Sequence, residues 1–207
     1  MELILGIYAD PYDPMSPVWC FDERPCMLIG DKVSPLPVEP GKSMRQNYDY
    51  ERHGSCSLFL AVQPLTGLCF VQVREQRTSL DYARFMNDFA EAHCPEGGKI
   101  TLVQDNLNTH TPASFYKAFP PPLAFDLMHK FDMKFTPKKA SWLNMAEIQL
   151  SILSRQCLSR RIPSISLLEQ EVLSWVRQRN LNPVPISWQF TPDLARDKFK
   201  RFYSNLS

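Results

Sequence analysis

Three acidic residues in this sequence each stand beside a hydrophobic segment, although they are far apart along the chain. Asp22 lies in the aromatic-rich run 18–23, Asp105 follows the apolar run 100–104, and Glu147 lies near the start of a segment with helical periodicity. Carboxylates held between a sheet and a helix are suitable ligands for hard divalent cations. The sequence therefore suggests metal-dependent phosphoryl transfer, provided that the fold brings the three acids together.

The first acid has a neighbour of the same charge. Val18–Glu23 is bounded by Pro17 and Pro25 and is typical of a strand. Side chains alternate along a strand, so Asp22 and Glu23 must face opposite sides of the sheet. We take Asp22 as the candidate ligand and Glu23 as the weaker one.

The second acid stands at the end of a predicted strand. Ile100–Gln104 follows a Gly-Gly turn signal, and Thr111-Pro112 predicts the start of the next helix. Asp105 to His110 then forms the loop at the carboxyl end of the strand, which is where α/β sheets bind ligands. An Asp-Asn pair in this place is equally compatible with an ordinary turn.

The third acid belongs to a predicted helix. Ser141 is a suitable N-cap, and one face of the helix is apolar: Trp142, Ala146, Leu150, Leu153 and Cys157. Glu147 lies at the margin of this face, and Asn144 is placed to orient its carboxylate by a hydrogen bond. The alternative interpretation is an amphipathic helix with a solvated glutamate.

The other elements must position these acids. We expect a short helix at 2–9, a hairpin from 57–62 and 68–73, a strand at 131–135, and further helices at 79–93, 112–119, from 120, at 164–179 and from 192. Prolines between 28 and 50 predict a weakly structured connection that carries Lys32, Lys42 and Arg45. This connection is either a plain surface loop or a segment that contacts a DNA backbone.

Several motifs resemble one known family. They are Tyr12-Asp13-Pro14, Cys20-Phe21-Asp22-Glu23, Asp49–Gly54, Asp105–His110, Ser141–Glu147, Trp188–Thr191 and Ala195-Arg196. The chain resembles the catalytic domain of bacterial insertion-sequence transposases of the mariner-related branch, in the DDE group. The resemblance implies an α/β, RNase H-like mixed five-stranded sheet flanked by helices, with additional C-terminal helices.

The resemblance also implies a site and partners. Asp22, Asp105 and Glu147 would be the catalytic triad and would bind two Mg²⁺ or Mn²⁺ ions that cut and join double-stranded DNA at element ends and target. Asn106, His110 and Asn144 would be auxiliary, with His110 positioning Asp105, a water or a phosphate. Such transposases generally act as homodimers. Asp105 and Glu147 are 42 positions apart, which is longer than usual in the branch and indicates an extra helix or loop.

The family usually carries an N-terminal helix-turn-helix region, and this sequence starts almost at the catalytic domain. Three explanations stay open: a separately encoded N-terminal part, an internal start at Met1, or a decayed copy. Two functions follow. One is a transposase that cleaves and transfers strands, and the other is a silent remnant that binds DNA or a full-length transposase without cutting. An RNase H or a Holliday-junction nuclease would use the same acids, but the Ser141–Glu147 motif argues against both.

Composition favours one domain spanning 1–207, because 207 residues with 44% apolar content can bury one core. The formal net charge of +1 hides an asymmetry: residues 1–129 carry −6 and residues 130–207 carry +7. The basic third is where a polyanion should bind. The candidate DNA-binding side chains are Arg52, Lys138, Lys139, Arg155, Arg160 and Arg161.

The six cysteines show no C-x-x-C pair, so we expect reduced and mostly buried thiols. The start lacks the basic and long apolar regions of a signal peptide, and no apolar run approaches the ~18 residues of a membrane span. These features predict a cytoplasmic, nucleoid-associated protein.

Overall fold

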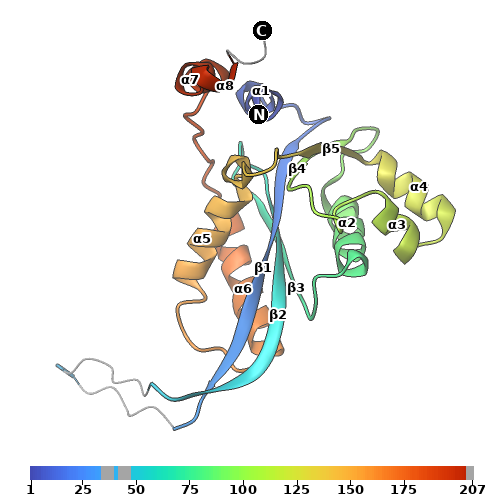
Figure 1. The fold of residues 1–207 in the computed structure, drawn as a ribbon. Coiled ribbons are helices and arrows are strands. Elements are labelled where there is room, and N and C mark those ends of the chain that lie inside the picture. The colour runs from blue at the N-terminus through green and yellow to red at the C-terminus, as the bar shows by residue number, and fades with distance from the viewer. Residues whose placement is uncertain (34–39, 42–47, 204–207) are drawn as a thin grey trace.

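The computed structural model describes residues 1–33, 40–41 and 48–203, which form a mixed five-stranded sheet with helices on both faces (Figure 1). The strands are β1 (Val18–Asp31), β2 (Tyr50–Val62), β3 (Cys69–Arg74), β4 (Ile100–Gln104) and β5 (Phe131–Phe135). The helices are α1 (Glu2–Ala9), α2 (Ser79–His93), α3 (Ala113–Ala118), α4 (Pro121–His129), the 3₁₀ turn η1 (Ser141–Leu143), α5 (Ala146–Gln156), α6 (Ile165–Leu181), α7 (Pro192–Lys198) and α8 (Lys200–Tyr203).

The sheet order is β3-β2-β1-β4-β5, so β1 is central. β1, β2 and β3 are antiparallel neighbours, whereas β4 runs parallel to both β1 and β5. Parallel neighbours require crossover connections, and α2 and the α3–α4 pair provide them. This arrangement is the α/β mixed sheet expected from the sequence.

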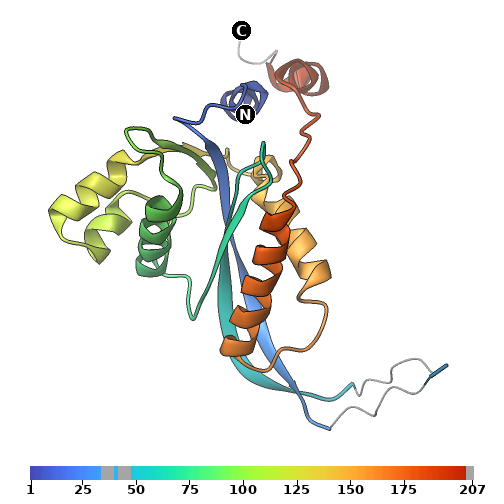
Figure 2. The same cartoon turned by 180° about the vertical axis from the view of Figure 1, so that it is seen from behind.

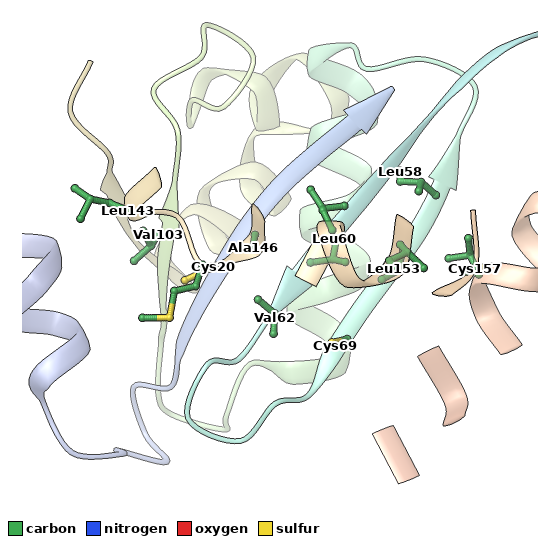
Figure 3. Packing of buried hydrophobic residues seen from close by; sticks show 14 of the residues in the cluster. Cys20, Leu58, Leu60, Val62, Cys69, Val103, Leu143, Ala146, Leu153 and Cys157 are labelled. Atoms are coloured by element: carbon green, nitrogen blue, oxygen red, sulfur yellow. The ribbon is translucent and has the colours of Figure 1, made fainter. Parts of the chain in front are cut away.

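Side-chain alternation divides the core into two layers. On β1, Cys20 faces the layer under α5 and α6, whereas Trp19 and Phe21 face the layer under α2, α3 and α4. Figure 3 shows the first layer, in which Leu60 of β2 and Ala146 and Leu153 of α5 meet over the sheet. The same alternation decides which face of the sheet Asp22 and Glu23 take.

The first strand is longer than the sequence predicted. β1 continues through Pro25 to Asp31 and pairs with β2 along this length, so a weakly structured connection beginning at Leu28 was wrong. β4 pairs with β1 only at Val18–Cys20, so at Pro25 one edge of β1 has no strand partner and a residue without an N–H is tolerated. Lys42 and Arg45 lie outside the described residues.

The predicted helix start at Ser141 was also wrong. Ser141–Leu143 is a 3₁₀ turn, and α5 begins at Ala146. The Asn144 side chain accepts a hydrogen bond from the Ala146 N–H at 3.1 Å, and the turn before it is thereby set apart from the helix. Trp142, which we had placed on the apolar face, is 42% exposed and packs against Phe190.

Side-chain caps begin three of the helices. Thr78 caps α2 through a capping box with Asp81, and Ser164 and Thr191 cap α6 and α7. All six cysteines are free, and none of the described helices is long and apolar enough to cross a bilayer. Helix α1 lies beside α7 (Figure 2), and Arg196 pairs with Glu2 at 2.7 Å.

Candidate active site

Strand pairing places Asp22 and Asp105 at the same level of the sheet. β1 and β4 are parallel, with Cys20 opposite Val103. Asp22 lies two residues after Cys20 on β1, and Asp105 lies two residues after Val103, directly after the end of β4. Residues 83 positions apart in sequence are therefore neighbours at the carboxyl end of β4.

Glu147 reaches this edge from the first turn of α5. Asn144, which is buried, donates from its side-chain amide to the Phe21 carbonyl at 2.7 Å and so fixes the start of α5 on β1. Tyr8 of α1 donates to the Leu143 carbonyl at 2.7 Å from the other side. The segment before α5 is thus attached to Phe21, the residue next to Asp22. Glu147 is the second residue of α5, and its side chain is exposed.

Electrostatics indicate that the three acids are close. Burial raises the pKa of Asp22 from 3.8 to about 7, and the charges of Asp105 and Glu147 contribute to the rise. A hydrogen bond from the Glu23 N–H at 2.8 Å and the charge of His110 oppose this shift. Asp22 is therefore about half protonated near neutral pH. A bound cation would offset the neighbouring negative charges and favour the ionised carboxylate.

Glu23 takes the opposite face of β1, as alternation requires. Its side chain is only 4% exposed, and its Oε2 lies 3.5 Å from Nε2 of His110. His110 is fully buried, and its Nδ1 lies 2.6 Å from Oδ1 of Asp105. Glu23 is thus not beside Asp22 as a second ligand but is connected to Asp105 through an imidazole.

The two carboxylates set the charge of His110. Burial alone lowers its pKa, but the contacts with Asp105 and Glu23 outweigh burial and raise the pKa from 6.5 to about 9. The imidazole stacks on Tyr82 with ring centroids 4.8 Å apart. His110 is therefore a cation at neutral pH, enclosed by aromatic rings.

Sequence reasoning missed three residues around His110. Tyr82 stacks on it and donates to the side chain of Gln104 at 2.9 Å, and Gln104 in turn donates to the His110 carbonyl at 3.3 Å. Arg77 lies 3.8 Å from Glu23. The sequence offered one signal, a glutamine that ends an apolar run directly before Asp105.

The other auxiliary residues differ. Asn144 does not hydrogen-bond the Glu147 carboxylate as we expected, because its side chain is used by Phe21 and Ala146. Asn106 is exposed in the loop after Asp105. Asn144 therefore acts on the position of α5 and not on the orientation of one carboxylate.

The predicted basic residues fall into two groups. Lys138 and Lys139 are exposed and follow β5, whose end is level with the end of β4, so they lie at the same edge as Asp105. Arg155, Arg160 and Arg161 lie at or beyond the far end of α5, roughly 12 Å or more from Glu147 at the rise of about 1.5 Å per helical residue.

Two of the arginines remote from Glu147, Arg160 and Arg161, have carboxylate partners of their own. Arg160 pairs with Glu171 at 2.5 Å, and Arg161 pairs with Asp31 at 2.6 Å. Arg161 and Arg52 both stand over the Tyr50 ring, at 5.8 and 5.9 Å from its centroid. This group contributes to holding the long β1–β2 arm against α6, whatever else it binds.

The donor set fits Mg²⁺ or Mn²⁺, which prefer oxygen ligands. Buried polar atoms without an aligned hydrogen bond gather here, among them Oδ1 of Asp105, Oε2 of Glu23 and Nε2 of His110. Across the described part of the chain no three His, Cys, Asp or Glu side chains are already close enough to hold a metal ion. The carboxylates would therefore have to draw together on binding one.

Comparison with solved structures defines the class of the fold. The Mos1 mariner transposase in its paired-end complex with Mn matches with a TM-score of 0.57 at 13% identity, covering 85% of this chain and 52% of that one. The Mos1 catalytic domain with raltegravir and Mg matches at 0.53 and 11% identity, covering 85% and 78%. A simian T-cell lymphotropic virus intasome chain matches at 0.51 and 13%, covering 79% and 50%. The fold is RNase H-like, as in transposase and integrase catalytic cores, and the chain spans about half the length of the first Mos1 chain.

The family follows from a sequence model. Residues 17–169 match the model described as DDE superfamily endonuclease, which is most of the chain. No curated protein matches. The chain therefore belongs to the DDE superfamily endonucleases.

Proposed function

We propose that this chain is the catalytic domain of an insertion-sequence transposase of the mariner-related branch, which cuts and joins double-stranded DNA with divalent metal ions. The observation that supports the proposal is the register of β1 and β4, which sets Asp22 level with Asp105, together with the charges of Asp105 and Glu147 that raise the pKa of Asp22. Family membership and the Mos1 fold support the reaction class.

In this proposal Asp22, Asp105 and Glu147 hold two Mg²⁺ or Mn²⁺ ions. When bound, the ions supply activation of a water or 3′-hydroxyl and stabilise the leaving oxygen. Asp22 would have to lose its proton before it binds an ion, because burial raises its pKa to about 7. Asp105 and Glu147 approach from β4 and α5.

The surroundings of the acids suit a nucleic acid. Lys138 and Lys139 offer charge to phosphates at the active edge. Arg52, Arg155, Arg160 and Arg161 would guide a more distant part of the duplex. The solved Mos1 complex holds a transposon end, and we infer the same substrate class here, with action as a homodimer in the cytoplasm, at the nucleoid. A helix-turn-helix region, which the family usually carries, would supply recognition of the element ends.

A plasmid-nicking assay tests the proposal. Wild-type protein with Mg²⁺ or Mn²⁺ should convert supercoiled plasmid to the nicked form, and EDTA should stop the reaction. Glu147→Gln should reduce the rate by at least about 100-fold, because it removes a charged ligand and keeps the shape. Glu169→Gln, an exposed change on α6, is the matched control and should cleave like wild type.

Two results would count against it. Equal cleavage by wild type and Glu147→Gln would place the activity elsewhere or in a contaminant. DNA binding without any cleavage by the wild type would favour the alternative, a remnant that binds DNA or a full-length transposase without cutting.

A further inference from the structure

β1 carries a positive side chain next to the proposed catalytic edge. Arg24 follows Asp22 by two residues, so alternation places both side chains on the face of the sheet that α5 covers. The Arg24 guanidinium donates from Nη1 to Oγ of Ser154 on α5. Ser154 follows Glu147 by two helical turns, so Arg24 reaches the side of α5 that carries Glu147.

The contact with Ser154 leaves Arg24 able to bind an anion. The Ser154 hydroxyl donates to the Leu150 carbonyl at 2.6 Å and accepts from Arg24. This contact engages Nη1 alone, and a guanidinium carries further N–H donors on Nε and Nη2. Arg24 is also exposed, so an anion can approach these donors from solvent.

Arg24 stands at one end of a cleft beside the edge of β1 that β4 does not cover. The cleft has a volume of about 200 Å³, and its lining consists of residues 24–29 of β1, Leu158, residues 160–162 and Leu168. At the other end the Ile29 N–H donates to the Ile162 carbonyl at 2.9 Å. The cleft therefore leads away from the neighbourhood of Asp22 along β1.

The cleft is lined by three arginines that differ in their partners. Arg160 and Arg161 pair with Glu171 at 2.5 Å and with Asp31 at 2.6 Å. Arg24 forms no ion pair with a carboxylate in the described part of the chain. It therefore supplies the uncompensated positive charge of the cleft, in the planar fork that suits a phosphate.

We propose that Arg24 binds a backbone phosphate of the DNA strand and so holds that strand in register over the three acids. This inference rests on the proposed function. Ser154 lies about 10 Å along α5 from Glu147, at the rise of about 1.5 Å per helical residue. Phosphates of one strand are spaced about 3.4 Å along the duplex axis, so Arg24 meets a phosphate roughly three nucleotides from the one that is cut.

Three substitutions separate phosphate binding from the attachment of α5 to β1. Arg24→Gln removes the charge, whereas Ser154→Ala removes the contact with α5 and keeps the charge. Arg84→Gln is the matched control, because it removes one positive charge at an exposed position of α2, on the opposite face of the sheet. Affinity for a fluorescein-labelled duplex is measured by anisotropy in EDTA over a range of KCl concentrations, so the readout requires neither metal nor cleavage.

Arg24→Gln should weaken duplex binding about 5- to 10-fold near 0.1 M KCl and reduce the slope of log affinity against log salt by about 0.9, the value for one lost phosphate contact. Ser154→Ala and Arg84→Gln should stay within about twofold of wild type and keep its slope. The inference is overturned by equal slopes in Arg24→Gln and Arg84→Gln, or by an equal loss of affinity in Ser154→Ala.

Arginine modification tests the same contact without a variant that has to fold. Phenylglyoxal is applied to wild type with and without the duplex, and mass spectrometry locates the modified side chains. The duplex should protect Arg24 and leave Arg84 reactive, and equal modification of Arg24 in both samples would overturn the inference. A wild type that nicks plasmid without any Arg24 effect leaves the proposed function standing, whereas one that binds through Arg24 without nicking overturns the cleavage and keeps the contact.

Discussion

Replacing Asp22 with asparagine should stabilise the metal-free protein at alkaline pH. The pKa of Asp22 is raised from 3.8 to about 7, chiefly by burial and then by Asp105 and Glu147. A raised carboxyl pKa means that the folded state binds the proton more tightly than the unfolded state. Stability is therefore lost as pH rises from about 4 to about 7, and the loss is complete above pH 7.

The magnitude follows from the same values. A rise from 3.8 to about 7 corresponds to at most roughly 4 kcal/mol of folding free energy above pH 7. The asparagine side chain would carry no charge, and its oxygen can still accept the Glu23 N–H bond. Asp22→Asn should thus raise the free energy of unfolding by about 2 to 4 kcal/mol at pH 8 and change it little at pH 4.

The assay is urea denaturation in EDTA at pH 4, 6 and 8, followed by fluorescence. Asp126→Asn, an exposed change on α4, is the control and should have little effect at any pH. Mg²⁺ should reverse the order at pH 8 by stabilising wild type and not Asp22→Asn. A variant less stable than wild type at pH 8, or a gain of the same size at pH 4, would refute the electrostatic reasoning.

Three further predictions concern neighbouring groups. The pKa of His110 is raised from 6.5 to about 9, so the protonated imidazole adds roughly 3 kcal/mol to the free energy of unfolding below pH 6.5. This stabilisation is lost as pH rises through 9. His110→Asn should remove this pH dependence from urea denaturation in EDTA. Asn144→Ala should cost about 2 to 3 kcal/mol of unfolding free energy by orphaning the Phe21 carbonyl, whereas the exposed Asn106→Ala should cost under about 0.5 kcal/mol. Burial raises the pKa of the fully buried Cys20 to about 12, so iodoacetamide at pH 8 should leave it unlabelled in native protein, as mass spectrometry can show.

Much of the fold could be predicted from short-range signals. Capping residues fixed the starts of α2, α6 and α7, because a threonine or serine side chain satisfies a backbone N–H locally. The start of α5 could not be predicted in this way. Ser141 looked like a cap, but α5 begins only at Ala146, after Asn144, whose side chain is held by the Phe21 carbonyl of a strand 123 positions away.

The course of β1 through Pro25 shows the same limit. Proline normally ends a predicted strand, and here it is tolerated because β4 covers only the beginning of β1. The residues around Pro25 do not indicate how long the neighbouring strand in the sheet is. It is set by where β4 ends, some 80 residues later.

The amino-acid sequence alone determined the element types, the two chemical kinds of face on each strand, and the three acids on which the proposed function depends. Only the tertiary structure decided that Glu23 serves His110, that His110 holds Asp105, and that Asn144 anchors a helix and does not orient Glu147. The physical reason is distance: periodicity and capping act over a few residues, whereas the partners of a buried charge are chosen by whichever strands and helices pack beside it.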